Sequence, residues 1–185
     1  MKKLSLFLYV PILTTVGISP IFAESNLKYF FGPSNAYNNV LVREVISADT
    51  IKLESGEKIK LIGLRAPAIP KSDRDDIERD EHGIPVESPV DPKKDASVEM
   101  RSYFFAVKLL EGKRVRLEFD TEKKNENYET LAYIFLPKDN LFANAEIIRQ
   151  GYAELSQSPL NTKYADQLRA AYKEARDEHR GLFDQ

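Results

Sequence analysis

The sequence has no cysteine and only two histidines, which removes several classes of site. Without cysteine the chain forms no disulfide, offers no thiol nucleophile and has no cysteine ligand for zinc. His82 and His179 stand far apart with no ligand pattern around them, so we interpret both as surface residues rather than zinc ligands. The eight glycines form no phosphate-binding loop, and no serine lies in a Gly-x-Ser-x-Gly string.

An excess of positive charge is also missing. The chain carries 27 basic and 29 acidic residues, a formal charge of −2. Proteins that bind nucleic acid through bulk electrostatics normally show a basic face, so this balance argues against such binding. A local basic groove stays open as an alternative.

The one long apolar run lies near Met1 and predicts an export signal. Two lysines are followed by the mainly apolar residues 4–18 and by small residues that end at Ala23. The run is shorter than the about 20 residues of a membrane span and contains Pro11, so we expect cleavage after Ala23 rather than a retained anchor. Cleavage of residues 1–23 would leave 25 basic and 29 acidic residues, a formal charge of −4. We expect the mature protein in the periplasm or outside the cell, with no stable membrane span.

The remainder is organised as one domain, which is large enough to bury a core without disulfides. Residues 24–38 form a leader, whose cluster Tyr29-Phe-Phe31 is expected to pack against the domain rather than to bind a partner. Residues 39–185 form the domain, with a loop insertion at about 68–95. This insertion is rich in proline and acidic residues, which indicates a surface loop rather than a calcium site.

Hydrophobic periodicity predicts three strands, a helix, two strands and two helices. Five strands interrupted by a helix favour an α+β, mainly β fold: a five-stranded OB-type barrel with three α-helices. The turn after the second strand is placed at Glu54–Glu57, and the apolar face of the first helix at Val98, Phe105 and Leu109. The expected elements are 40–46, 50–53, 58–64, 96–110, 113–120, 130–136, 143–150 and 163–179.

Six local strings in this order give the chain a family resemblance. Each string is weak alone, but together they run from about Val40 to Phe183, and the chain resembles the staphylococcal nuclease (thermonuclease) family. The strings are Asp49-Thr-Ile51, Leu61-Ile-Gly-Leu-Arg-Ala-Pro67, Leu109-Leu-Glu-Gly-Lys-Arg-Val-Arg-Leu117, Leu131-Ala-Tyr-Ile134, Ile148-Arg-Gln-Gly151 and Arg180-Gly-Leu-Phe183.

The resemblance implies calcium-dependent hydrolysis of phosphodiester bonds, but most positions that it assigns to this chemistry are substituted. The family's first metal ligand falls on Asp49, while the Asp of its Asp-Gly-Asp-Thr string falls on Ser47 and its second carboxylate ligand on Arg65. The glutamate assigned to water activation falls on Ala68, which has no titratable group.

The two arginines that the family uses to clamp the phosphate are also replaced. The first falls on Lys60, which keeps the charge but lacks the bidentate fork. The second, in the family's Tyr-Gly-Arg-Gly-Leu-Ala-Tyr pattern, falls on Glu129, whose carboxylate would repel a phosphate. A carboxylate of the insertion, such as Asp73 or Asp75, is an alternative source of a rearranged metal site.

Two interpretations of the remaining carboxylate stay open. In the first, the Arg65 guanidinium takes the place of calcium and pairs with Asp49. In the second, Asp49 only holds the turn after the first strand and Arg65 points into solvent.

The sequence therefore predicts an exported, thermonuclease-like domain with a degenerate site, used as a non-catalytic binding or scaffold module without a cofactor. The acidic balance makes a protein or cell-envelope partner a better expectation than nucleic acid. The alternative is a calcium-dependent phosphodiesterase acting on DNA or RNA, so whether the protein is an enzyme stays open. The sequence gives neither the partner nor the oligomeric state.

Overall fold

The computed structural model describes residues 36–69, 78, 80, 81, 96–156 and 159–184, which belong to a folded unit spanning Asn35–Gln185. The expected signal, the Tyr29-Phe-Phe31 cluster and nearly all of the acidic insertion lie outside the described residues. The end of the expected leader is described. There the Tyr37 ring packs edge-on against Phe119, with 4.8 Å between centroids.

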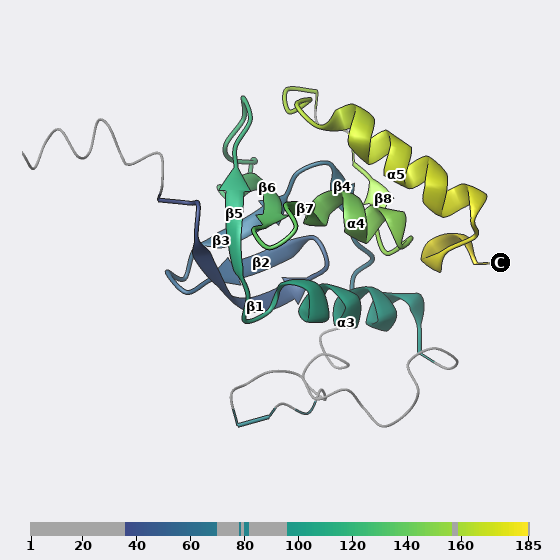
Figure 1. The fold of residues 1–185 in the computed structure, drawn as a ribbon, viewed down its shortest axis with the longest axis horizontal. Helices are drawn as coiled ribbons and strands as arrows, with labels where there is room; N and C mark the ends of the chain where they lie inside the picture. Colours follow the sequence, from purple (N-terminus) through teal and green to yellow (C-terminus); the bar gives the residue numbers. More distant parts are fainter. Residues whose placement is uncertain (1–35, 70–77, 79, 82–95, 157–158, 185) are drawn as a thin grey trace, which may run out of the picture. The chain divides into compact units, whose positions relative to one another are not determined.

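Three antiparallel strands begin the barrel, as the sequence predicts (Figure 1). They are β1 (Val40–Ser47), β2 (Thr50–Leu53) and β3 (Lys58–Leu61). Ile59 and Leu61 are buried while Lys58 is exposed, because alternate side chains of a strand point to opposite faces. The turn into β3 contains Gly56 at φ 88°, a backbone conformation that glycine adopts without strain.

Two further strands close the barrel. β5 (Arg114–Glu118) pairs with β1, and β6 (Thr130–Leu136) pairs antiparallel with β5. The opposite edge of β6 pairs in parallel with β3, so the order β3-β2-β1-β5-β6 returns on itself. The fold is an α+β, five-stranded closed barrel with three helices, which confirms the predicted fold class.

In the described part of the chain the α-helices are α3 (Val98–Leu110), α4 (Ala143–Arg149) and α5 (Ala165–Asp177). The predicted apolar face of α3 is confirmed only in part. Phe105 and Leu109 are partly buried and pack against the core, but the fully buried residues include Tyr103, Ala106 and Leu110. Apolar residues occur all round this helix, so its packing against β1, α4 and η1 (Gly181–Phe183) selects the buried side.

Four short elements were not predicted. They are β4 (Leu64–Arg65), β7 (Leu141–Phe142), β8 (Glu154–Leu155) and the 3-10 helix η1 (Gly181–Phe183). The strand predicted over 58–64 ends at Leu61 because the chain turns at Gly63, where φ is 81°. A β-carbon there would lie 2.3 Å from Leu168 Cδ1 of α5, so a side chain at this position would displace Leu168 in addition to straining the backbone.

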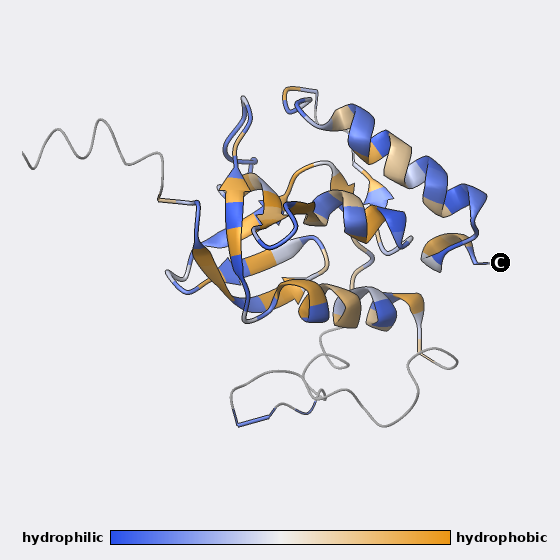
Figure 2. Cartoon of the chain, viewed as in Figure 1, coloured by the Kyte–Doolittle hydropathy of each residue, from blue (hydrophilic) through white to orange (hydrophobic). Residues whose placement is uncertain are grey.

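The core fills the barrel and the space between the barrel and the helices. Figure 2 shows apolar residues, coloured orange, on the strands. One buried polar residue, Asn144 of α4, ties these layers together. Its amide oxygen accepts from Ile134 N at 2.9 Å, and its amide nitrogen donates to Ile62 O at 2.9 Å. Among the helices in the described part of the chain, none has the length and apolar character needed to cross a membrane.

Candidate functional site

Asp49 lies in the turn between β1 and β2, and its carboxylate accepts hydrogen bonds from several segments. Oδ1 accepts from the hydroxyls of Ser47 at 2.7 Å and Thr50 at 2.9 Å. Oδ2 lies 2.8 Å from the Lys60 ammonium of β3 and accepts from Ala66 N at 2.9 Å. Both carboxylate oxygens are therefore engaged by the protein itself.

The environment of Asp49 keeps its carboxylate ionised. The residue is only 3% exposed, and burial alone would raise its pKa. The hydrogen bonds from Lys60 and Ser47, the ammonium charge and the Ala66 amide outweigh burial and hold the pKa of Asp49 below its ordinary value. The result is a charged, buried carboxylate paired with a lysine whose side chain is 32% exposed.

Lys60, and not Arg65, supplies the cation of this pair, which corrects the first interpretation of Asp49. The β2–β3 hairpin places Lys60 opposite Thr50, next to Asp49, and Lys60 Nζ also lies 3.2 Å from the Thr50 hydroxyl. Arg65 instead lies in β4 opposite Glu154 of β8, and its Nη2 donates to that carboxylate at 2.9 Å. Both side chains of the second pair are largely exposed.

In the described part of the chain, the other two site positions make no hydrogen bond or ion pair with Asp49 or Lys60. Ala68 is exposed and carries no group that activates water. Glu129 precedes β6, and its carboxylate accepts from the Asn125 amide at 2.8 Å, while Asn125 Oδ1 accepts from Glu129 N at 2.9 Å. Glu129 is thus held within the loop between β5 and β6.

The donor set around Asp49 does not match what calcium requires. Calcium takes six to eight oxygen ligands, and carboxylates supply most of the charge. Within the described residues, no group of three or more histidine, aspartate or glutamate side chains is placed to hold a metal ion. The Lys60 ammonium already lies against Asp49 Oδ2, so a cation at that oxygen would meet a like charge. Asp73 and Asp75 lie outside the described residues.

A cavity of about 390 Å³ adjoins the ion pair. The end of β3 and the turn after it form one wall, the loop between β5 and β6 forms another, and Leu131 and Ser156 complete the lining. Lys60 is shared between the cavity and the Asp49 site. The lining residues are Lys60, Leu61, Ile62, Gly63, Leu64, Glu122, Asn125, Glu126, Asn127, Leu131 and Ser156.

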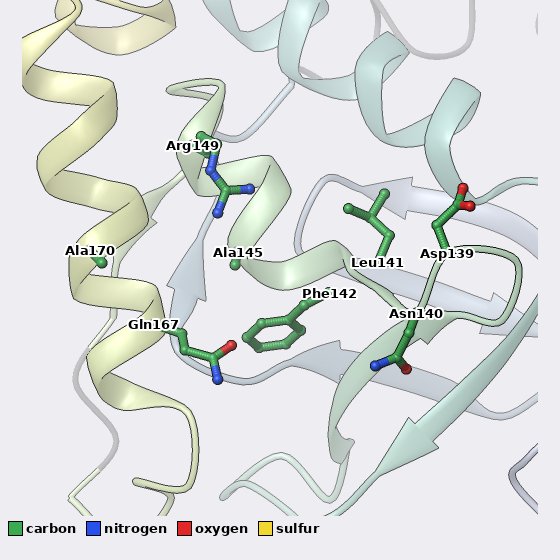
Figure 3. A pocket seen from close by; sticks show the side chains of 8 residues that line it. All are labelled: Asp139, Asn140, Leu141, Phe142, Ala145, Arg149, Gln167 and Ala170. Carbon is green, nitrogen blue, oxygen red and sulfur yellow. The ribbon is translucent and has the colours of Figure 1, made fainter.

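A second cavity of about 360 Å³ lies between α4, α5 and the β6–β7 hairpin (Figure 3). In this view the Gln167 side chain extends from α5 toward the Phe142 ring. Arg149, which also lines it, is engaged by Glu146 at 2.5 Å and by Glu174 at 3.1 Å.

The model of a protein family described as staphylococcal nuclease homologue matches residues 58–185. This range includes β3 with Lys60, and helices α3, α4 and α5. The chain belongs to this family. Two similar proteins, both named thermonuclease, come from staphylococci. That of Staphylococcus intermedius is 31% identical over 147 residues, which cover 78% of this chain and 75% of the relative. That of Staphylococcus hyicus is 29% identical over 181 residues, which cover 95% and 94%.

Membership in the staphylococcal nuclease family confirms the predicted resemblance and agrees with the observed barrel. The functional roles assigned to Ser47, Asp49, Lys60, Arg65 and Glu129 stay predictions.

Sequence reasoning missed three contributors to this region. They are the pairing of Lys60 with Asp49, the Glu154 partner of Arg65, and Ser156 in the cavity wall. The first could not be counted from the predicted turn, because a turn at Glu54–Glu57 places Leu61 opposite Thr50, one residue away from the observed partner Lys60. The other two come from a segment about 90 residues away and left no local pattern.

Proposed function

We propose that this protein is an exported, non-catalytic binding module built on a thermonuclease-like barrel. The observation that carries the proposal is the 2.8 Å pair between Lys60 Nζ and Asp49 Oδ2. A lysine that neutralises this carboxylate supplies the positive charge that a metal ion would otherwise bring. The carboxylate then stabilises the fold instead of binding a cation.

The substituted positions support the same conclusion. Phosphodiester hydrolysis needs an activated water and positive groups for the charge that develops in the transition state. Ala68 offers no base, and the Glu129 carboxylate brings charge of the wrong sign. Loss of a single charge-stabilising group commonly lowers the rate by roughly 10²- to 10³-fold, and this chain departs at several such positions.

The competing function is a metal-dependent phosphodiesterase, which family membership and the names of the two staphylococcal relatives favour. The two functions are separated by incubating the purified protein with single-stranded DNA and with RNA in calcium, magnesium or manganese. We expect no cleavage above that of an Asp49→Ala variant. Metal-dependent cleavage by the native chain that Asp49→Ala abolishes would establish the phosphodiesterase instead.

A melting experiment tests the metal site without relying on activity. A ligand that binds only the folded state raises its melting temperature, and the rise grows with ligand concentration. We expect millimolar calcium to leave the melting temperature of the native chain unchanged. Stabilisation that depends on calcium concentration and is lost in Asp49→Ala would show a functioning ion site.

Export is proposed from residues 1–23 alone, since their charged, apolar and small-residue regions are typical of a signal. N-terminal sequencing of the protein recovered outside the cytoplasm tests this part, and we expect it to begin at Glu24. Recovery of the uncleaved chain in the membrane fraction would contradict it. A protein or cell-envelope component is the partner we favour.

A further inference from the structure

The 390 Å³ cavity lies where barrels of this type bind extended ligands. OB-type barrels bind oligonucleotides and oligosaccharides across the face of their second and third strands, together with the loop that joins the fourth and fifth. Here the end of β3 forms one wall of the cavity, and the loop between β5 and β6, the fourth and fifth barrel strands, forms the opposite wall. The volume is within the usual range for a ligand site and suits one or two sugar rings.

The charge of the lining decides between the two ligand classes. Glu122 and Glu126 line the cavity, and among its described lining residues the one cation, Lys60, is already paired with Asp49. The two lysines of the same loop, Lys123 and Lys124, are exposed and do not line it. Two carboxylates without a free counter-charge repel a phosphodiester backbone, whereas an uncharged ligand meets no such repulsion.

The cavity also presents polar groups that the protein leaves available. Within the described part of the chain, the side chains of Glu122, Glu126, Asn127 and Ser156 take part in no hydrogen bond or ion pair. Together they offer carboxylate and carbonyl acceptors, an amide donor and a hydroxyl that both donates and accepts. This mixture complements the hydroxyl groups of a sugar, each of which donates and accepts.

An exposed aromatic residue follows one of these groups in the sequence, although it does not itself line the cavity. Tyr128 directly follows Asn127, and it is 82% exposed. Its φ of 61° is unusual for a bulky residue, and the neighbouring hydrogen bonds of Asn125 hold the loop in this conformation. An exposed tyrosine offers a rigid apolar face, against which the C–H face of a pyranose ring stacks, and a hydroxyl for hydrogen bonding.

We propose that the cavity between β3 and the 122–127 loop, with Tyr128 at its side, binds a neutral oligosaccharide. This inference rests on the proposed non-catalytic function, and it specifies the cell-envelope partner favoured there as a glycan. Tyr128 supplies the stacking surface, and Glu122, Glu126, Asn127 and Ser156 supply the hydrogen bonds.

The test measures binding of three neutral tetrasaccharides to the purified full-length protein by calorimetry and by NMR chemical shifts. The probes are cellotetraose, maltotetraose and the tetramer of N-acetylglucosamine, with an eight-nucleotide oligothymidylate as the charged comparison. We expect at least one sugar to bind with a dissociation constant of about 1 mM or below, and its affinity to be unchanged between 50 and 500 mM salt, since no counterions are released.

Two variants locate the site. Tyr128→Gly removes the ring while glycine accepts the positive φ, so we expect at least about a tenfold loss of affinity without a lower melting temperature. Gln167→Ala, in the second cavity, is the matched control and should bind like the native chain. Loss of sugar binding in Gln167→Ala but not in Tyr128→Gly would overturn the assignment to this cavity.

The remaining outcomes separate this inference from the proposed function. Absence of binding by all three sugars, without nuclease activity, overturns the glycan inference alone. Salt-sensitive binding of the oligothymidylate without cleavage also overturns it and leaves a non-catalytic module. Metal-dependent cleavage of the oligonucleotide overturns the proposed function and this inference with it.

Discussion

Asp49 is buried, and the hydrogen bonds that it accepts come from three separate segments. Ser47 ends β1 and Thr50 begins β2 on either side of the turn, Lys60 belongs to β3, and Ala66 to the chain just after β4. Through these hydrogen bonds the Asp49 carboxylate holds both the β1–β2 turn and the backbone just after β4 in position. Its removal therefore affects stability whatever its role in binding.

Replacing Asp49 by alanine is expected to destabilise the fold clearly. The Lys60 ammonium and the Ala66 amide lose their shared acceptor, and we expect a loss of about 2 kcal/mol or more in the free energy of unfolding, measured in urea. The double variant Asp49→Ala/Lys60→Met should recover part of the lost free energy of unfolding, because it no longer contains an ammonium without a partner carboxylate.

The exposed pair of Arg65 and Glu154 provides the matched control. Arg65 is 72% exposed at its side chain, so Arg65→Ala should change the free energy of unfolding by less than about 1 kcal/mol. If Asp49→Ala were as mild as Arg65→Ala, Asp49 would not be the structural tie described here.

At this scale the sequence identified the substituted positions but not their partners. Ser47, Arg65 and Glu129 stand out once the chain is set beside the family pattern. Which cation reaches Asp49, however, depends on strand register and on where a distant strand passes. Glu154 lies 89 residues after Arg65, and its capture of that guanidinium could not be anticipated from local patterns.

Gly151 and Gly181 bring two separate elements into close backbone contact. Gly151 follows the C-cap of α4, and its carbonyl accepts from Leu182 N of η1 at 2.8 Å. A β-carbon on Gly151 would lie 2.0 Å from Arg180 O, and one on Gly181 would lie 2.3 Å from Gly151 O. Two strings that carry the family resemblance, Ile148–Gly151 and Arg180–Phe183, therefore meet in space.

Gly151→Ala is expected to be much more damaging than a glycine substitution with the same backbone conformation elsewhere. Gly112 has φ 69° against 72° for Gly151, but a β-carbon there meets nothing within 4 Å. Gly112→Ala should cost about 1 kcal/mol from the positive φ alone, and Gly151→Ala at least about 2 kcal/mol more because backbone must move. Chemical denaturation of both variants measures the difference, and equal costs would rule out the steric explanation.

Elements with a strong hydrophobic period could be predicted from the sequence, whereas elements defined by contacts with distant segments could not. β6 was predicted with its observed bounds, because Thr130–Leu136 is a continuous β-rich run. β4 and β8 are two-residue strands that exist only because each pairs with the other across the fold. The face of α3 was predicted only in part because its apolar residues surround the helix, and its contacts with β1, α4 and η1 define the buried side.

At the scale of the folded unit, side-chain contacts connect the barrel to the segment that begins α5. Glu118 at the end of β5 lies at the centre of one connection. Its carboxylate accepts from Lys163 Nζ at 2.5 Å and Tyr164 Oη at 2.7 Å, and it also pairs with Arg116. Arg116 in turn lies over the Phe135 ring, 4.4 Å from its centroid. The segment that begins α5 is thus held to β5 by charge-assisted hydrogen bonds.

This connection is expected to contribute to the acid sensitivity of the fold. Burial alone would raise the pKa of Glu118, but hydrogen bonds from Lys163, Arg116 and Tyr164 outweigh it and lower the pKa from 4.5 to about 2. Because the folded value is depressed, the stabilisation is fully present above the unfolded value of 4.5. It is lost as the pH falls from 4.5 toward 2.

Glu118→Gln should therefore change both the level and the slope of the stability curve. The variant should be less stable than the native chain at pH 7, and its free energy of unfolding should fall less between pH 5 and pH 2, because the group that takes up a proton there is gone. Urea unfolding at each pH measures both. The exposed Glu54→Gln is the control and should keep the native slope. Parallel curves for Glu118→Gln and the native chain would mean that other carboxylates, and not the link between β5 and α5, govern acid unfolding.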